Sequence, residues 1–196
     1  MADMEYDELI SRLDEQLQSV KCEIWRKVHI SPTREVALFA TRIKWNLVRV
    51  PVHLCVDYMA GPKPDDFDAL LEESLAYSKR AFAARAWRRF ILSSFAIIPC
   101  LVCDIAYPET ISFVRNRHRI LKFHRKHWFH GLVFYPVLYC LSTNETYYWT
   151  GFEYVGSAVW PYARKFIEES IVAATTTNTQ NSNRRQSSPE LYDEGG

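Results

Sequence analysis

The sequence predicts a mainly α-helical protein, in which amphipathic helices surround two short apolar segments, with a minor strand-like portion. Three observations predict this fold class. Apolar residues recur at helical spacing in several stretches of the chain. Two apolar runs, residues 90–107 and 128–142, each contain a proline near the middle. Residues 174–196 have almost no apolar side chains, and a segment of this kind cannot bury enough surface to fold, so we expect a disordered tail.

The chain of 196 residues is long enough to bury a core of its own. We divide it into an N-terminal helical region (1–60), an apolar and basic helical unit (61–173) and the tail (174–196). The net charge of +1 argues against a protein whose whole surface binds nucleic acid. The five cysteines are odd in number and scattered, which predicts reduced thiols in a reducing compartment. Because the acidic first residues lack a basic and an apolar part, we expect no cleavable signal peptide.

Residues 4–28 are predicted to form the first helix, because their apolar residues alternate at spacings of three and four. Acidic residues are frequent at its start and cations at its end, which suits the helix dipole. About three heptads of this stripe would allow a short coiled coil, and so a homo-oligomer or a contact with a partner. The residues predicted for self-association are Ile10, Leu13, Leu17 and Ile24. The alternative is that the same stripe packs on the core of its own chain.

A second helix is predicted to begin at Ser31 and Pro32, with Val36, Phe39, Ile43 and Leu47 at helical spacing. Residues 47–56 then alternate like a strand, which Pro51 would confine to a sheet edge. Residues 59–66 are a turn by composition. Asp65 or Asp66 is predicted to cap the next helix, whose apolar side carries Phe67, Leu71, Leu75, Phe82, Ala86 and Phe90.

A further helix is predicted from Pro108 and Glu109, with Ile111, Val114, Leu121 and Trp128 as its apolar stripe. Its other residues are largely cationic. Residues 144–160 are aromatic and partly strand-like, and residues 161–172 are predicted to form the last amphipathic helix.

The apolar run 90–107 is nearly long enough for a membrane-spanning helix, which needs about 20 apolar residues. Asp104 lies near one edge of the run, where a charge is less costly. Clusters of Lys and Arg lie on both sides of the run, however, and a crossing would place one cluster on the wrong side. Two interpretations therefore remain: a hairpin that bends at Pro99 and dips into one leaflet, or an element buried in a soluble core.

The residues with reactive side chains give no clear enzyme motif. Cys100 and Cys103 form a C-x-x-C, but their apolar neighbours would raise the thiol pKa values, so we expect two buried thiols. The histidines between residues 118 and 130 are too few for a di-iron site and predict a basic face that gains charge in acid. We expect no catalytic residue, no metal and no cofactor.

The predicted function is binding without catalysis. We expect an intracellular protein at the cytoplasmic face of a membrane, with an anionic lipid surface as its partner. The residues predicted to bind lipid or nucleic acid are Arg88, Arg89, Arg115, Arg117, Arg119, Lys122, Arg125, Lys126 and Trp128. The alternative is a soluble helical module that binds nucleic acid or protein through the basic stretch 115–126.

Overall fold

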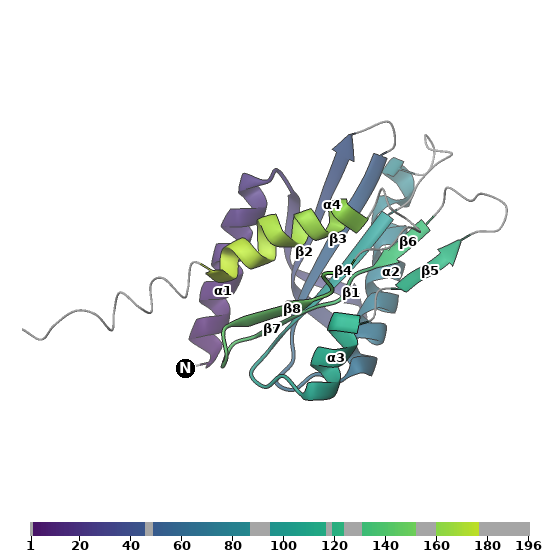
Figure 1. Cartoon of the computed structure of the whole chain (residues 1–196). Coiled ribbons are helices and arrows are strands. Elements are labelled where there is room, and N and C mark those ends of the chain that lie inside the picture. The colour runs from purple at the N-terminus through teal and green to yellow at the C-terminus, as the bar shows by residue number, and fades with distance from the viewer. Residues whose placement is uncertain are drawn as a thin grey trace, which may run out of the picture.

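The computed structural model describes residues 2–45, 49–86, 95–116, 119–123, 131–151 and 160–176. Within these residues the chain is a mixed α/β fold, with one mixed sheet between two layers of helices (Figure 1). The mainly α fold class predicted from the sequence is therefore wrong. The apolar segments that we assigned to helices or to a membrane hairpin form strands of this sheet instead.

The elements follow one another along the chain in an order that begins with a helix and a three-stranded meander. They are α1 (Ala2–Ser19), β1 (Glu23–Ser31), β2 (Arg34–Trp45), β3 (Arg49–Tyr58), α2 (Pro64–Ala86), β4 (Phe95–Cys103), α3 (Pro108–Asn116), β5 (Arg119–Phe123), β6 (Gly131–Phe134), β7 (Val137–Cys140), β8 (Glu145–Tyr148) and α4 (Trp160–Ile167). A π-helical segment, Glu168–Val172, follows α4 directly.

The sheet begins with the antiparallel strands β1, β2 and β3 and continues with β4, which is parallel to β3. Both β6 and β7 pair with β4 in parallel, one after the other along its length. The outer row consists of β5, antiparallel to β6, and β8, antiparallel to β7. The region boundary expected near residue 60 lies between β3 and β4, which are neighbours in the same sheet.

The prolines in the two apolar runs lie beside each other in the sheet. The strand β4 pairs with β6 up to Ile97, beside Phe134, and with β7 from Cys100, beside Val137. Both ladders keep one register, which places Pro99 next to Pro136. Neither proline has an N–H to donate. Both therefore lie at the same interruption in the strand pairing of β4, where its pairing with β6 ends and its pairing with β7 begins. One interpretation of the run expected a membrane hairpin that bends at Pro99. In the structure Pro99 lies within strand β4 instead.

Each face of the sheet has its own core. On one face α1 and α4 cover apolar residues of β2, β3, β4, β6 and β7, and on the other face α2 and α3 cover the opposite side of these strands (Figure 1). The strand β4 is buried on both faces, since the residues from Ala96 to Cys103 are all buried. Strands buried on both faces are near-continuous apolar runs, which explains the composition of residues 95–103.

Two of the helices predicted within residues 1–60 differ from the structure. The helix predicted over residues 4–28 ends at Ser19, and Lys21 has a positive φ of 60° just before β1 begins. Ile24 therefore lies in β1 and not on the helix. The helix predicted from Ser31 is strand β2, which the Ser31–Arg34 turn joins to β1 in a hairpin. The predicted edge strand at residues 47–56 is β3, which is internal, and its pairing with β4 begins at Val52, just after Pro51.

Other predicted elements agree with the structure. The helix predicted to be capped by Asp65 or Asp66 is α2, but it begins at Pro64, so both aspartates lie in its first turn. The strand-like stretch contains β8, and the last amphipathic helix is α4 with its π-helical extension. None of the helices in the described ranges is both long and apolar enough to cross a membrane. Most of the predicted tail lies outside the described residues, which end at 176.

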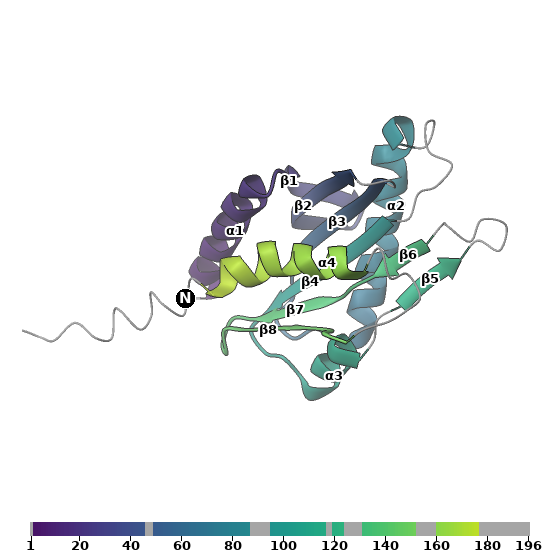
Figure 2. The same ribbon diagram turned by 45° about the horizontal axis from the view of Figure 1, so that its top comes forward.

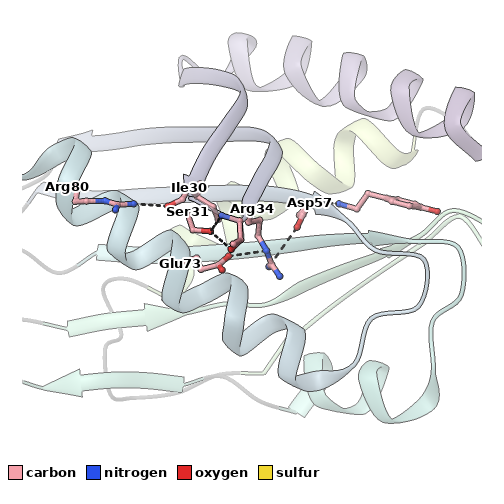
Figure 3. A network of polar contacts seen from close by, with 8 residues as sticks. Ile30, Ser31, Arg34, Asp57, Glu73 and Arg80 are labelled. Carbon is pink, nitrogen blue, oxygen red and sulfur yellow. Dashed lines mark hydrogen bonds and ion pairs between the residues drawn. The ribbon is translucent and has the colours of Figure 1, made fainter.

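Arg34, at the start of β2, lies between two acidic side chains, one on α2 and one on β3 (Figure 3). The Arg34 guanidinium lies 3.0 Å from the Glu73 carboxylate on α2 and 3.8 Å from the Asp57 carboxylate on β3. Arg80 of α2 donates a hydrogen bond of 2.8 Å to the carbonyl of Ile30 on β1. These contacts fasten the β1–β2 hairpin to α2, and all of them are internal to the chain.

Removal of the Arg34 charge is expected to destabilise the fold. Arg34→Met would leave two partly buried carboxylates close together, and we expect a loss of about 2 kcal/mol in the free energy of unfolding, less than for a fully buried pair. Urea denaturation measures this loss. Glu168→Gln, in an exposed pair with Arg164, is the matched control and should change stability by less than about 1 kcal/mol. Equal effects of the two changes would contradict the prediction.

Candidate functional site

The basic stretch predicted from the sequence lies at one edge of the sheet. Residues 115–126 contain six Lys and Arg residues and no acidic residue. Arg115 is in the last turn of α3, and Arg119 and Lys122 are in β5. The helix expected through this stretch is wrong, because α3 ends at Asn116 and the chain turns into an antiparallel ribbon. The remaining predicted residues lie outside the described ones: Arg88, Arg89, Arg117, Arg125, Lys126 and Trp128.

The strand β5 is the outermost strand at its end of the sheet and pairs with β6 (Figure 2). The register between β5 and β6 shifts between Ile120 and Lys122, which is a bulge or irregularity. Figures 1 and 2 both show this pair of strands at the end of the molecule away from α1. We call α3's last turn, β5 and β6 together the cationic ribbon.

Arg115 is held at the base of the cationic ribbon by an aromatic ring. Its guanidinium carbon lies 5.0 Å from the centre of the Tyr147 ring on β8, within the range of a cation–π contact. The Tyr147 hydroxyl donates a hydrogen bond to the Glu145 carboxylate, and this bond raises the pKa of Tyr147. Arg115 itself is exposed. The ring therefore fixes the position of an exposed, planar cation beside β5.

The residues predicted for self-association lie against the chain's own sheet. Leu13 and Leu17 are 2% and 0% exposed in the core under α1 and α4. Ile10 and Ile24 are partly buried and pack against the same core. The expected coiled coil is therefore wrong, since the apolar stripe of α1 is covered by its own domain.

Sequence reasoning missed a set of polar contacts at the carboxyl ends of β4 and β7. The carbonyl oxygen of Asp104 accepts a hydrogen bond of 2.6 Å from the Ser142 hydroxyl and one of 3.3 Å from the Cys140 thiol. The Asp104 carboxylate accepts another from the Tyr58 hydroxyl at the end of β3. Asp104, which complicated a membrane interpretation, is thus the residue that ties the ends of three parallel strands together. No sequence pattern marks this arrangement, because residues 58, 104 and 142 are far apart in the chain.

The C-x-x-C residues do not face each other. Cys100 lies in the core under α1 and α4, whereas Cys103 lies in the core under α2 and α3. This follows from the alternation of side chains along a strand, which sends residues three apart to opposite faces. As expected, burial raises the pKa values of both thiols, and that of Cys103 reaches about 12. The register places Cys140 of β7, and not Cys100, beside Cys103.

Comparison with known proteins adds no family to these observations, because no family model, curated protein or solved structure matches the chain. Among the residues that the structure describes, there is no group of three or more His, Cys, Asp or Glu side chains that could hold a metal ion. The cationic ribbon is consequently the feature on which a function can be built.

Proposed function

We propose that the protein binds the phosphate backbone of duplex DNA through the cationic ribbon and that it does so without catalysis. The observation that carries this proposal is the position of the basic stretch. Cations that lie close together in the sequence begin at the end of α3, with Arg115, and continue on the outermost strand of the sheet, with Arg119 and Lys122. A low overall net charge of +1 suits binding by one local surface and not by the whole molecule.

The shape of the cationic ribbon favours DNA over a lipid surface. Binding at a lipid surface by an amphipathic helix needs a helix with one apolar and one basic side, and residues 119–123 form a strand. Proteins with β-sheets can place strands in a groove of duplex DNA, and Lys and Arg on an edge strand such as β5 can neutralise phosphates. A basic, irregular edge strand also resists pairing with a strand of another chain, so a polyanion is a better partner than a peptide strand.

The test is a titration of a fluorescently labelled short DNA duplex with the full-length protein, followed by anisotropy at several salt concentrations. We expect binding that weakens as salt increases, because phosphate contacts release counterions. Arg119→Gln and Lys122→Gln should each weaken binding, and each should reduce the slope of log K against log salt by about 1. Arg115→Gln should act in the same direction.

Lys27→Gln is the matched control, because Lys27 is an exposed cation on β1, the strand at the opposite edge of the sheet. It should leave the affinity and its salt dependence unchanged. Association with an anionic membrane stays a prediction and forms the second arm, in which vesicles containing phosphatidylserine replace the duplex. Binding to these vesicles without binding to the duplex would overturn the proposal, as would equal effects of Lys27→Gln and Lys122→Gln.

A further inference from the structure

Cys103 and Cys140 lie side by side at the carboxyl ends of β4 and β7. They are partners in the parallel register of these strands, and both side chains belong to the core under α2 and α3. The two thiols are also close enough for Cys140 to raise the pKa of Cys103. Neighbouring strands lie about 4.8 Å apart, and disulfides join cysteines with Cα atoms roughly 4.4–6.8 Å apart. A disulfide between them therefore needs no change in strand pairing.

The Cys140 sulfur lies beneath the turn that joins β7 to β8. Its thiol donates a hydrogen bond of 3.3 Å to the Asp104 carbonyl and lies 3.3 Å from the Ser142 hydroxyl oxygen. Polar groups of Ser142 and Thr143 lie close enough to this sulfur to lower its pKa. Cys140 is only 1% exposed, but Ser142 and Thr143 are exposed. One short turn thus separates the sulfur from solvent.

We propose that Cys140 and Cys103 form an oxidisable dithiol that reacts with small hydroperoxides. The Cys140 thiolate attacks the terminal oxygen of the hydroperoxide, the O–O bond breaks, and the alcohol leaves with a proton, so that Cys140 becomes a sulfenic acid. The Cys103 thiol then attacks this sulfur, an S–S bond forms, and water leaves with the hydroxyl group and the Cys103 proton. The two electrons lost by the cysteine pair reduce the hydroperoxide.

The surroundings of the two thiols assign their roles. The pKa of Cys140 is lowered from its usual value: burial raises it, but the nearby polar groups of Ser142 and Thr143 lower it by more. Burial raises the pKa of Cys103 to about 12, and its contact with Cys140 adds to this effect. The thiolate is the reactive form of a cysteine. Cys140 has the lower pKa of the two thiols, and its sulfur lies beneath the exposed turn at Ser142 and Thr143. Cys140 is therefore assigned as the attacking residue, and Cys103 as the residue that resolves the sulfenic acid.

The experiment treats the reduced full-length protein with a small excess of hydrogen peroxide at neutral pH and follows the products by intact mass and peptide mapping. We expect a Cys103–Cys140 disulfide, seen as a loss of two hydrogen atoms and reversed by dithiothreitol. Cys103→Ser should stop at a sulfenic acid on Cys140 that dimedone traps. Cys140→Ser should leave Cys103 as a free thiol at the same dose of peroxide.

Cys55→Ser is the matched control, because Cys55 is buried in the same core but is not the register partner of another cysteine. It should form the disulfide as the parent does, and circular dichroism should show that each variant is folded. The unmodified chain provides a test that needs no variant. Oxidation of the half-exposed Cys22 before the pair, or a disulfide that forms only in denaturant, would overturn the proposal.

Discussion

Leu17→Glu is expected to leave the protein unfolded and largely insoluble. Leu17 is 0% exposed in the core that α1 and α4 form with the sheet. A carboxylate at this position would be buried without a partner, which costs several kcal/mol beyond the lost apolar contacts. Small domains are stable by only about 5–15 kcal/mol, so one such change approaches the whole stability. Solubility on expression and far-ultraviolet circular dichroism measure the result.

Two further variants make this expectation quantitative. Leu17→Ala should remain folded and lose about 3 kcal/mol in urea denaturation, in the range for a buried leucine. Ser11→Glu introduces the same charge at an exposed position of the same helix and should have almost no effect. A folded Leu17→Glu protein would contradict the placement of α1. If that protein were also a monomer while the parent is an oligomer, the stripe would face a second chain instead.

The helices whose presence the sequence predicted correctly, although α1 ends earlier than expected, are those with apolar residues on one side. In α1 the stripe through Leu9, Leu13 and Leu17 is covered by the sheet and the rest of the helix is polar, so its period is visible. In α2 the acidic residues at the start add a second signal. Both helices lie on the surface of the sheet, where one side meets water and the other does not.

The strands β2 and β4 were missed because they are buried on both faces. In β2 the residues from Val36 to Ala40 include apolar side chains of both cores. A run of this kind has apolar residues at helical spacing as well as at every other position, so Val36, Phe39 and Ile43 fit a helix equally well. In β4 the run is continuous, and only the position of Pro99 beside Pro136 explains its central proline.

The candidate sites also differ in how far the sequence alone predicts them. The positive charge of residues 115–126 can be read directly from the sequence, but their shape cannot, because the ribbon depends on pairing with β6. The dithiol depends wholly on tertiary structure, since Cys103 and Cys140 meet only through the register of β4 and β7. The C-x-x-C spacing brings Cys103 close to Cys100 in the sequence, but strand alternation places the two on opposite faces.

Acid is expected to destabilise the protein through His53 on β3. This histidine is 4% exposed, its Nδ1 atom lies 2.9 Å from the Thr41 hydroxyl oxygen, and its ring packs against Phe39. Burial lowers the pKa of His53 from 6.5 to about 4. Between these two pH values the unfolded chain binds one more proton at this position than the folded chain, so the free energy of unfolding falls as the pH falls.

The pKa difference of His53 corresponds to roughly 3 kcal/mol, lost as the pH drops through the range from 6.5 to 4, with little further change from this residue in stronger acid. Urea denaturation at pH 7, 6 and 5 should show about 2 kcal/mol of this loss in the parent by pH 5 and a much smaller loss in His53→Gln, whose amide can still bond to Thr41. His29→Gln, at an exposed position on β1, should behave like the parent. Carboxylates titrate in the same acid range, and for this reason the difference between the two variants is the quantity to compare. If the unfolding free energies of the parent and His53→Gln fall in parallel, the neutral, buried state assigned to His53 is wrong.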